Sequence, residues 1–124
     1  MMNRIHTESA PAAVGPYSQA VELGGIVYTS GQIALDPETG NLVGTTIEEQ
    51  AEQVMKNLVA VLEAAGTKPE NALKTLCFLT DIKDFAAFNE VYARYFSEKP
   101  ARSCVEVSAL PKGAICEVEV VAAV

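Results

Sequence analysis

The strongest pattern of hydrophobic positions lies between Thr46 and Ala65. Apolar residues recur there at positions 47, 51, 54, 58, 61, 62 and 65, which is the spacing of one face of an α-helix. Thr46 and Glu49 match a capping box at the start of this segment, and Gly66 stands where a glycine often ends a helix. The spacing therefore predicts an amphipathic helix over residues 46–65.

A second helical pattern follows Asp84, whose side chain can cap the first turn. Aromatic residues recur at helical spacing at positions 85, 88, 92, 95 and 96, and Pro100 stops the segment. Because large side chains at this spacing are typical of a buried helix face, we expect Phe85, Phe88 and Tyr95 in the core.

Five shorter runs are typical of β-strands. Gln19–Leu23 and Ile26–Ser30 flank Gly24-Gly25, and a two-residue glycine connection predicts a tight hairpin. The other runs lie at Leu73–Asp81, Arg102–Leu110 and Ile115–Val124. The expected order is hairpin, helix, strand, helix, strand and strand, which gives an α+β fold with two helices against one mixed sheet.

We expect one domain over residues 1–124, because no linker, repeat or low-complexity segment interrupts the chain. If both helices cover one face of the sheet, the other face stays open, and we expect its apolar residues to pack on a partner chain. Apolar residues make up 49% of the sequence, a small excess that fits such an interface and equally fits a well-filled core.

The charge balance and the residue composition narrow the range of possible functions. Lysine and arginine number 9 against 16 aspartate and glutamate, and the net charge of −7 disfavours nucleic acid and anionic membranes as partners. The 3 cysteines are far apart and the 1 histidine cannot build a multi-histidine site, so no metal centre is indicated. No run reaches the ~20 apolar residues of a membrane span. The first residues lack the apolar core of a signal peptide, so the expected location is the cytoplasm.

Two strand-forming segments carry the residues best suited to chemistry. Alternation places Arg102, Cys104 and Glu106 on one face of their strand, and Glu117 and Glu119 on one face of the last strand. The Arg102 guanidinium can hold a carboxylate through two parallel hydrogen bonds, or it can form an ion pair with Glu106 or a glutamate of the last strand. The register of these strands is not fixed by the sequence, so the proximity of Arg102 and Glu117 stays open.

Glu117 and the three cysteines can each be interpreted as reactive groups or as ordinary structural residues. Glu117 can orient or deprotonate a water molecule, or it can face solvent as an ordinary strand residue. Cys104 is disfavoured as a nucleophile, because activation usually needs a neighbouring base and His6 is the only histidine. Cys77 and Cys116 are expected as small core residues.

Four further residues are candidates to line a pocket. Tyr17 follows the Gly15-Pro16 turn, where an aromatic side chain is often at the surface or at a pocket mouth. Ser30 and Gly31 end a strand, and a glycine there lets a ligand approach the backbone. Asn89 is an amide among apolar and charged helix positions, either solvated or aimed at a pocket.

An ordered set of short motifs runs through the chain from about Arg4 to Val124. It comprises Gly15-Pro16-Tyr17-Ser18-Gln19-Ala20, Ser30-Gly31-Gln32-Ile33, Asp36-Pro37, Thr39-Gly40, Asn57, Leu62, Ala64-Ala65-Gly66, Asp84-Phe85, Asn89, Tyr92, Pro100-Ala101-Arg102-Ser103-Cys104-Val105-Glu106-Val107, Leu110-Pro111 and Glu117-Val118-Glu119. The segment around Arg102 is the most specific of these. With this set, the chain resembles the RidA family (also called YjgF/YER057c/UK114).

The resemblance implies a chorismate-mutase-like α+β fold, a mixed sheet with two helices packed on one face, assembled as a homotrimer with clefts between subunits. It implies no cofactor and no metal. The roles that it implies are substrate-carboxylate binding by Arg102, positioning of the attacking water by Glu117, backbone contacts from Gly31 and Cys104, closure of the pocket by Tyr17, and lining of the pocket by Ser30 and Asn89.

The implied activity is that of a 2-iminobutanoate/2-iminopropanoate deaminase. Such an enzyme hydrolyses the C=N bond of an enamine or imine of a short 2-oxo acid, and releases the 2-oxo acid and ammonia. Three alternatives stay open: a ribonuclease or translation-inhibitor activity, a non-catalytic module that binds a small carboxylate, and hydrolysis of a different imine on the same fold.

Overall fold

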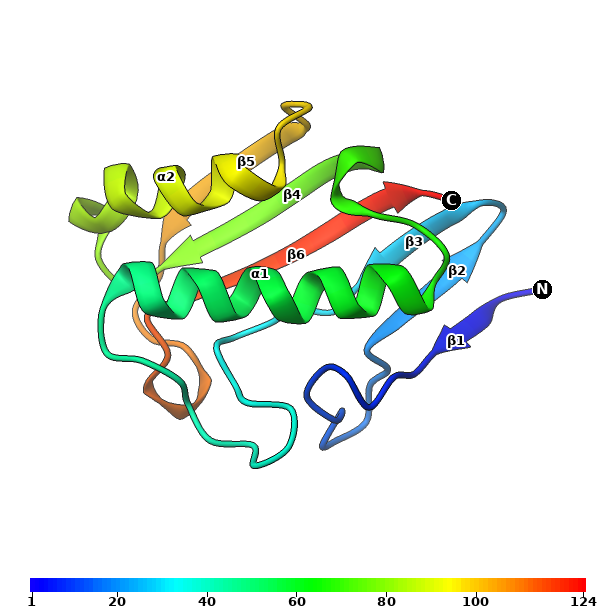
Figure 1. Ribbon diagram of the computed structural model, residues 1–124, viewed down its shortest axis with the longest axis horizontal. Helices are drawn as coiled ribbons and strands as arrows, with labels where there is room; N and C mark the ends of the chain where they lie inside the picture. Colours follow the sequence, from blue (N-terminus) through cyan, green and yellow to red (C-terminus); the bar gives the residue numbers. More distant parts are fainter.

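Six strands form one mixed sheet in the computed structural model, which describes residues 1–124. The sheet order is β1-β2-β3-β6-β4-β5 (Figure 1). The strands are β1 Asn3–Ile5, β2 Ala20–Leu23, β3 Ile26–Thr29, β4 Ala72–Leu79, β5 Ala101–Glu106 and β6 Cys116–Ala123. All neighbours are antiparallel except β4 and β5, which are parallel. The sheet therefore confirms the predicted α+β class, with β1 as an additional edge strand.

Two helices, α1 (Ile47–Ala64) and α2 (Phe85–Tyr95), lie on the same face of the sheet (Figure 1). The capping box of α1 is confirmed. The Thr46 hydroxyl accepts from the Glu49 backbone N–H at 3.2 Å, and the Glu49 carboxylate accepts from the Thr46 N–H at 3.1 Å. The predicted cap at Asp84 is wrong, because its side chain accepts no hydrogen bond from the helix. Asp81 does the capping instead, ahead of a 3₁₀ turn that leads into α2.

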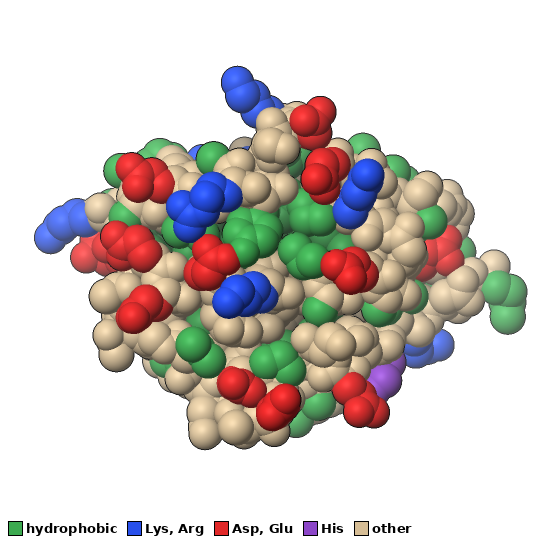
Figure 2. All heavy atoms as spheres, in the orientation of Figure 1, with side chains coloured by type: hydrophobic (Ala, Val, Ile, Leu, Met, Phe, Trp, Pro, Cys, Tyr) green, Lys and Arg blue, Asp and Glu red, His purple; other side chains and the backbone are tan.

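The core fills the space between the helices and the sheet. Along β6 the side chains of Cys116, Val118, Val120 and Ala122 are buried on the helix side, so Glu117 and the other alternate residues point to the open side. Figure 2 shows the helix-bearing face, where acidic and basic side chains are scattered and apolar side chains gather between α1 and α2. No helix of the protein has both the length and the apolarity needed to cross a membrane.

The last two strands do not pair with each other, although they follow one another in the chain. The parallel connection from β4 through α2 places β5 at the edge of the sheet, and β6 inserts between β3 and β4. β4 therefore separates the strand of Arg102 from the strand of Glu117. Thr75 of β4 lies opposite Arg102, and Phe78 lies opposite Glu117.

The open face of the sheet carries exposed apolar side chains. Leu23, Tyr28 and Val105 remain 54%, 48% and 44% exposed. Leu76 and Phe78 of β4 are half-buried next to Glu119 and Glu117 of β6. This distribution agrees with the expectation of an open apolar face. Single chains rarely leave such a surface uncovered.

Candidate functional site

Arg102 is held by α2 rather than by an acid. Its Nη1 donates to Asn89 Oδ1 at 2.7 Å, and its guanidinium carbon lies 4.8 Å from the ring centroid of Tyr92 and 5.4 Å from that of Phe85. These distances are those of cation–π contacts. The side chain of Arg102 is half-buried on the helix side of the sheet.

The ion-pair alternative for Arg102 is wrong. The one ion pair of the protein joins Arg94 to Glu52 at 3.1 Å. Glu106, the nearest candidate partner in the sequence, turns its carboxylate to the backbone N–H of Ile82, at 2.8 Å. The guanidinium therefore keeps hydrogen-bond donors that no carboxylate of the chain occupies, which suits it to bind an external carboxylate.

The side chains beneath the guanidinium come from one face of α2. Phe85, Asn89 and Tyr92 are spaced four and three residues apart, so they lie along one stripe of the helix. The prediction of a core position for Phe85 is wrong, since its side chain is 38% exposed beneath Arg102, whereas Phe88 is fully buried as predicted. The role of Tyr92 was missed, although its spacing from Asn89 is the signal that could have found it.

A hollow of about 310 Å³ opens beside this arginine. Its lining residues are Asn89, Tyr92, Ala93, Phe96, Lys99, Pro100 and Arg102. Both aromatic and cationic groups face it, so it can receive a small anion with an apolar part.

Glu117 lies on the other face of the sheet. Its side chain is half-buried and accepts no hydrogen bond within the chain. Burial raises the pKa of Glu117 above its usual value of 4.5, and the negative charge of Glu119 on the same face raises it further. A carboxylate with a raised pKa and free lone pairs is suited to take a proton from water.

Gly31 leaves room for this carboxylate. The Gln32 backbone exchanges hydrogen bonds of 2.9 and 3.1 Å with Val118, which fixes the glycine segment beside β6. A β-carbon on residue 31 would lie only 2.7 Å from the carboxyl carbon of Glu117, so a side chain there would displace it. The structure therefore brings Gly31 and Glu117 together, a proximity that the sequence alone did not indicate.

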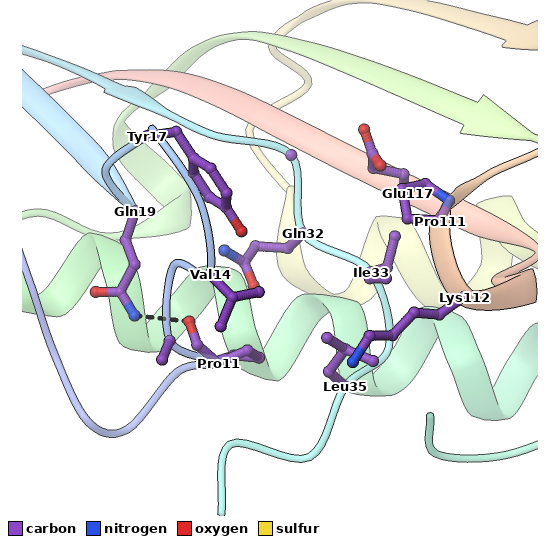
Figure 3. A pocket seen from close by; sticks show the side chains of 12 residues that line it. Pro11, Val14, Tyr17, Gln19, Gln32, Ile33, Leu35, Pro111, Lys112 and Glu117 are labelled. Atoms are coloured by element: carbon purple, nitrogen blue, oxygen red, sulfur yellow. Dashed lines mark hydrogen bonds between the residues drawn. The ribbon is translucent and has the colours of Figure 1, made fainter. Parts of the chain in front are cut away.

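A cavity of about 140 Å³ lies next to Glu117, with Tyr17 on its other side (Figure 3). Its walls are Pro11, Ala12, Val14, Tyr17, Gln19, Gly31, Gln32, Ile33, Leu35, Pro111, Lys112 and Glu117. Tyr17 is 52% exposed, as expected for a pocket mouth. Lys112 also lines the cavity, and nothing in its spacing along the sequence indicated this.

Two polar side chains hold the segment that carries Tyr17. The Ser30 hydroxyl donates to the Ser18 carbonyl at 2.6 Å, so it positions the backbone next to Tyr17. The buried amide of Gln19 donates to the Pro11 carbonyl at 2.8 Å and the Thr7 carbonyl at 3.0 Å (Figure 3 marks the first). The cavity wall is thus tied to strands β2 and β3.

The cysteines are not activated. Burial raises the pKa of Cys77 and Cys116 to about 12, and both lie in the core as predicted. Cys104 is half-buried opposite Cys77 in the sheet, and burial raises the pKa of its thiol more than Arg102 lowers it. None of the three has the electropositive, exposed surroundings of a reactive thiolate.

The candidate residues thus form two clusters in one chain. Arg102, Asn89 and Cys104 lie on the helix side at the β5 edge, whereas Tyr17, Ser30, Gly31 and Glu117 belong to the other end of the sheet, with Glu117 on its open face. No group of three acidic, histidine or cysteine side chains converges to hold a metal ion.

Comparison with known proteins extends over the whole chain. A family model described as Endoribonuclease L-PSP matches residues 7–124. A RutC family protein of Saccharolobus solfataricus is 52% identical over 123 residues, 98% of each chain. Among solved structures, YyfA of Yersinia pestis, from the conserved Rid protein family, superposes with a TM-score of 0.97 at 52% identity and covers 100% of both chains. TdcF of E. coli with bound serine gives 0.93 at 42% identity and covers 98% of both.

Proposed function

The chain belongs to the RidA family, and from that premise we propose that it hydrolyses 2-imino acids, and the enamines in equilibrium with them, to 2-oxo acids and ammonia. The substrates in this proposal are 2-aminoacrylate/2-iminopropanoate and 2-aminocrotonate/2-iminobutanoate. The observation that carries it is the Arg102 guanidinium, which is braced by Asn89 and Tyr92 and paired with no carboxylate. TdcF, which has the same fold, is described with bound serine, a small amino acid with the carboxylate that this arginine would hold.

A complete site would need two copies of the chain. Arg102 and Glu117 point to opposite sides of one sheet, so they cannot face the same small molecule within one chain. The open face beside Glu117 carries exposed apolar side chains that a second copy would bury. We therefore propose a homotrimer, in which Arg102 of one subunit meets Glu117 of its neighbour in a cleft.

Hydrolysis of an imine requires few protein groups. Arg102 would hold the substrate carboxylate, with Asn89 orienting the guanidinium. Glu117 would accept a proton from a water molecule as the water oxygen bonds to the imine carbon, and the imine nitrogen would take up a proton. As this adduct collapses, its hydroxyl proton would pass to the nitrogen, the C=O bond of the 2-oxo acid would form, and the C–N bond would break to release ammonia.

The remaining residues would shape the cleft. Gly31 would leave space for the Glu117 carboxylate and offer its backbone, and Tyr17 would close the mouth. Ser30 would hold the Tyr17 segment through the Ser18 carbonyl. Cys104 would contribute through its backbone, in keeping with the raised pKa of its thiol.

A trapping assay tests this function. A threonine dehydratase generates the enamine in the presence of semicarbazide, and an active protein suppresses semicarbazone formation. Arg102→Lys keeps the charge but loses the planar fork, so it should lose most of the activity. The matched control, Arg94→Lys, changes a surface arginine of α2 that lies outside the proposed site and should behave as the parent. Equal activity of parent and Arg102→Lys would contradict the proposal, and native mass spectrometry tests the trimer independently.

Two other functions fit parts of the data. The serine-bound relative suggests a module that binds a small carboxylate without turnover, and such a module would bind 2-oxobutanoate through Arg102 but leave semicarbazone formation unchanged. The family description names an endoribonuclease, yet the net charge of −7 disfavours RNA. A nuclease activity that copurifies with the assembly and disappears in Arg102→Ala would support that function instead.

A further inference from the structure

A buried pair of hydroxyl groups lies directly behind the arginine. The Tyr92 hydroxyl and the Thr75 hydroxyl are 2.6 Å apart, and Thr75 is fully buried while Tyr92 is 8% exposed. Thr75 belongs to β4, and its partner across the sheet on β5 is Arg102 itself. The pair therefore joins the middle of the sheet to the helix that supports the guanidinium.

The Tyr92 ring is fixed at several points. Its edge is tied to the sheet through the hydroxyl, and it stacks on the Phe96 ring with centroids 4.8 Å apart. The Arg102 guanidinium carbon lies 4.8 Å from the Tyr92 ring centroid. Any shift of the ring would move the surface against which the guanidinium rests.

We propose that the Thr75–Tyr92 hydroxyl pair is a positioning device that sets the orientation of Arg102 for carboxylate binding. The proposal rests on the proposed function, in which Arg102 holds the substrate carboxylate. In it, the two buried hydroxyls touch no substrate atom and act only through the arginine. Bidentate recognition depends on the plane of the guanidinium, so a ring that fixes this plane contributes to affinity without adding charge.

Thr75 is an unusual residue for its position, which supports a specific role. On the side away from Arg102 its neighbours on the buried face are the apolar side chains of Cys77 and Val120, and a hydroxyl buried there without a partner would be unfavourable. A valine has nearly the same shape and would avoid the polar group. The threonine is explained if its hydroxyl holds Tyr92.

The test compares single and double removal of the hydroxyls in the full-length, assembled protein. Tyr92→Phe keeps the ring, Thr75→Val keeps the shape, and Thr75→Ser keeps the hydroxyl. Thr67→Val is the matched control, because Thr67 is also buried and its hydroxyl donates to the Ala123 carbonyl, away from Arg102. The readouts are KM and kcat for 2-iminobutanoate, the affinity for 2-oxobutanoate by calorimetry, and Tm.

We expect Tyr92→Phe and Thr75→Val each to raise KM and weaken 2-oxobutanoate binding by about three- to tenfold, with kcat changed much less. The double variant should be no worse than either single variant, and Thr75→Ser should recover parental binding. Thr67→Val should lower Tm but leave KM and binding unchanged.

The inference is overturned if the hydroxyl variants lower Tm yet keep parental KM and binding, or if their effects add in the double variant. Failure of the proposed function gives a different pattern. In that case Arg102→Lys itself would leave 2-oxobutanoate binding intact, or the parent protein would bind the oxo acid without hydrolysing the imine.

Discussion

Arg102 and Glu117 point to opposite faces of the same sheet, with β4 between their strands. Arg102 rests on the α2 side, against Tyr92 and Asn89, and Glu117 stands on the open side, beside Gly31. Neither residue is neutralised by an opposite charge of the chain. In the proposed trimer, each of these unpaired residues would contribute one half of a site, and the neighbouring subunit would contribute the other half.

This relationship predicts complementation between two inactive variants. Arg102→Ala and Glu117→Ala should each be inactive alone. Co-refolding equal amounts should regenerate clefts in which an intact arginine meets an intact glutamate. For random mixing around a cyclic trimer, about one cleft in four combines both. The semicarbazide assay of the mixture should therefore show about a quarter of parental activity.

Each variant refolded alone provides the control, and native mass spectrometry establishes that mixed assemblies have formed. Mixed assemblies without recovered activity would exclude a site in which Arg102 of one subunit meets Glu117 of its neighbour, and activity in either variant alone would remove that residue from the reaction.

The fall of kcat at low pH should reflect protonation of the Glu117 carboxylate. The base must be ionised to accept a proton, and burial together with Glu119 raises the pKa of Glu117. The value of kcat should therefore fall, as the pH is lowered, at a pH above that expected for an ordinary glutamate. Glu119→Gln removes a neighbouring negative charge, so it should move this midpoint to lower pH. A midpoint that does not move in Glu119→Gln would contradict the assignment of this fall to Glu117.

Local elements of the fold could be predicted from the sequence because their causes are local. The α1 helix follows from its apolar spacing and the Thr46–Glu49 capping box, and the β6 alternation already put Glu117 opposite the core. The position of β6 between β3 and β4 could not be predicted, since strand order depends on contacts between residues far apart in the chain. This order decides whether Arg102 and Glu117 can meet.

Side-chain roles on α2 show the same limit. Phe85 has the spacing of a core residue, and only the neighbouring β5 edge turns that position into a support for Arg102. Asp84 is a residue type that often caps helices, yet its side chain caps nothing here. The Asp81 side chain instead caps the 3₁₀ turn over Ile82–Asp84, which leads into α2. Periodicity identifies which residues share a helix face, but it does not identify the element against which that face packs.

Gly31→Ala should impair catalysis more than folding. The added β-carbon would lie 2.7 Å from the carboxyl carbon of Glu117, and a flexible side chain can move away at little cost to the fold. The displaced carboxylate would then miss the water, and a misplacement of about 1 Å can cost ~100-fold in rate. We expect a fall in kcat of at least about tenfold. Tm and 2-oxobutanoate binding should stay close to parental, and an unchanged kcat would contradict the role of Gly31.

Glu117→Gln should stabilise the protein at neutral pH although it abolishes activity. The pKa of Glu117 is raised in the folded chain above its usual 4.5, so the folded state holds this proton more tightly than the unfolded state does. Between these two pKa values the unfolded carboxyl ionises first, and the free energy of unfolding falls as the pH rises. The loss is complete above the folded-state pKa. Glutamine cannot ionise, so Tm of the variant should exceed that of the parent at neutral pH and the two should converge well below 4.5. A variant that is less stable than the parent at neutral pH would show that the ionised carboxylate is stabilised by a partner in the assembly.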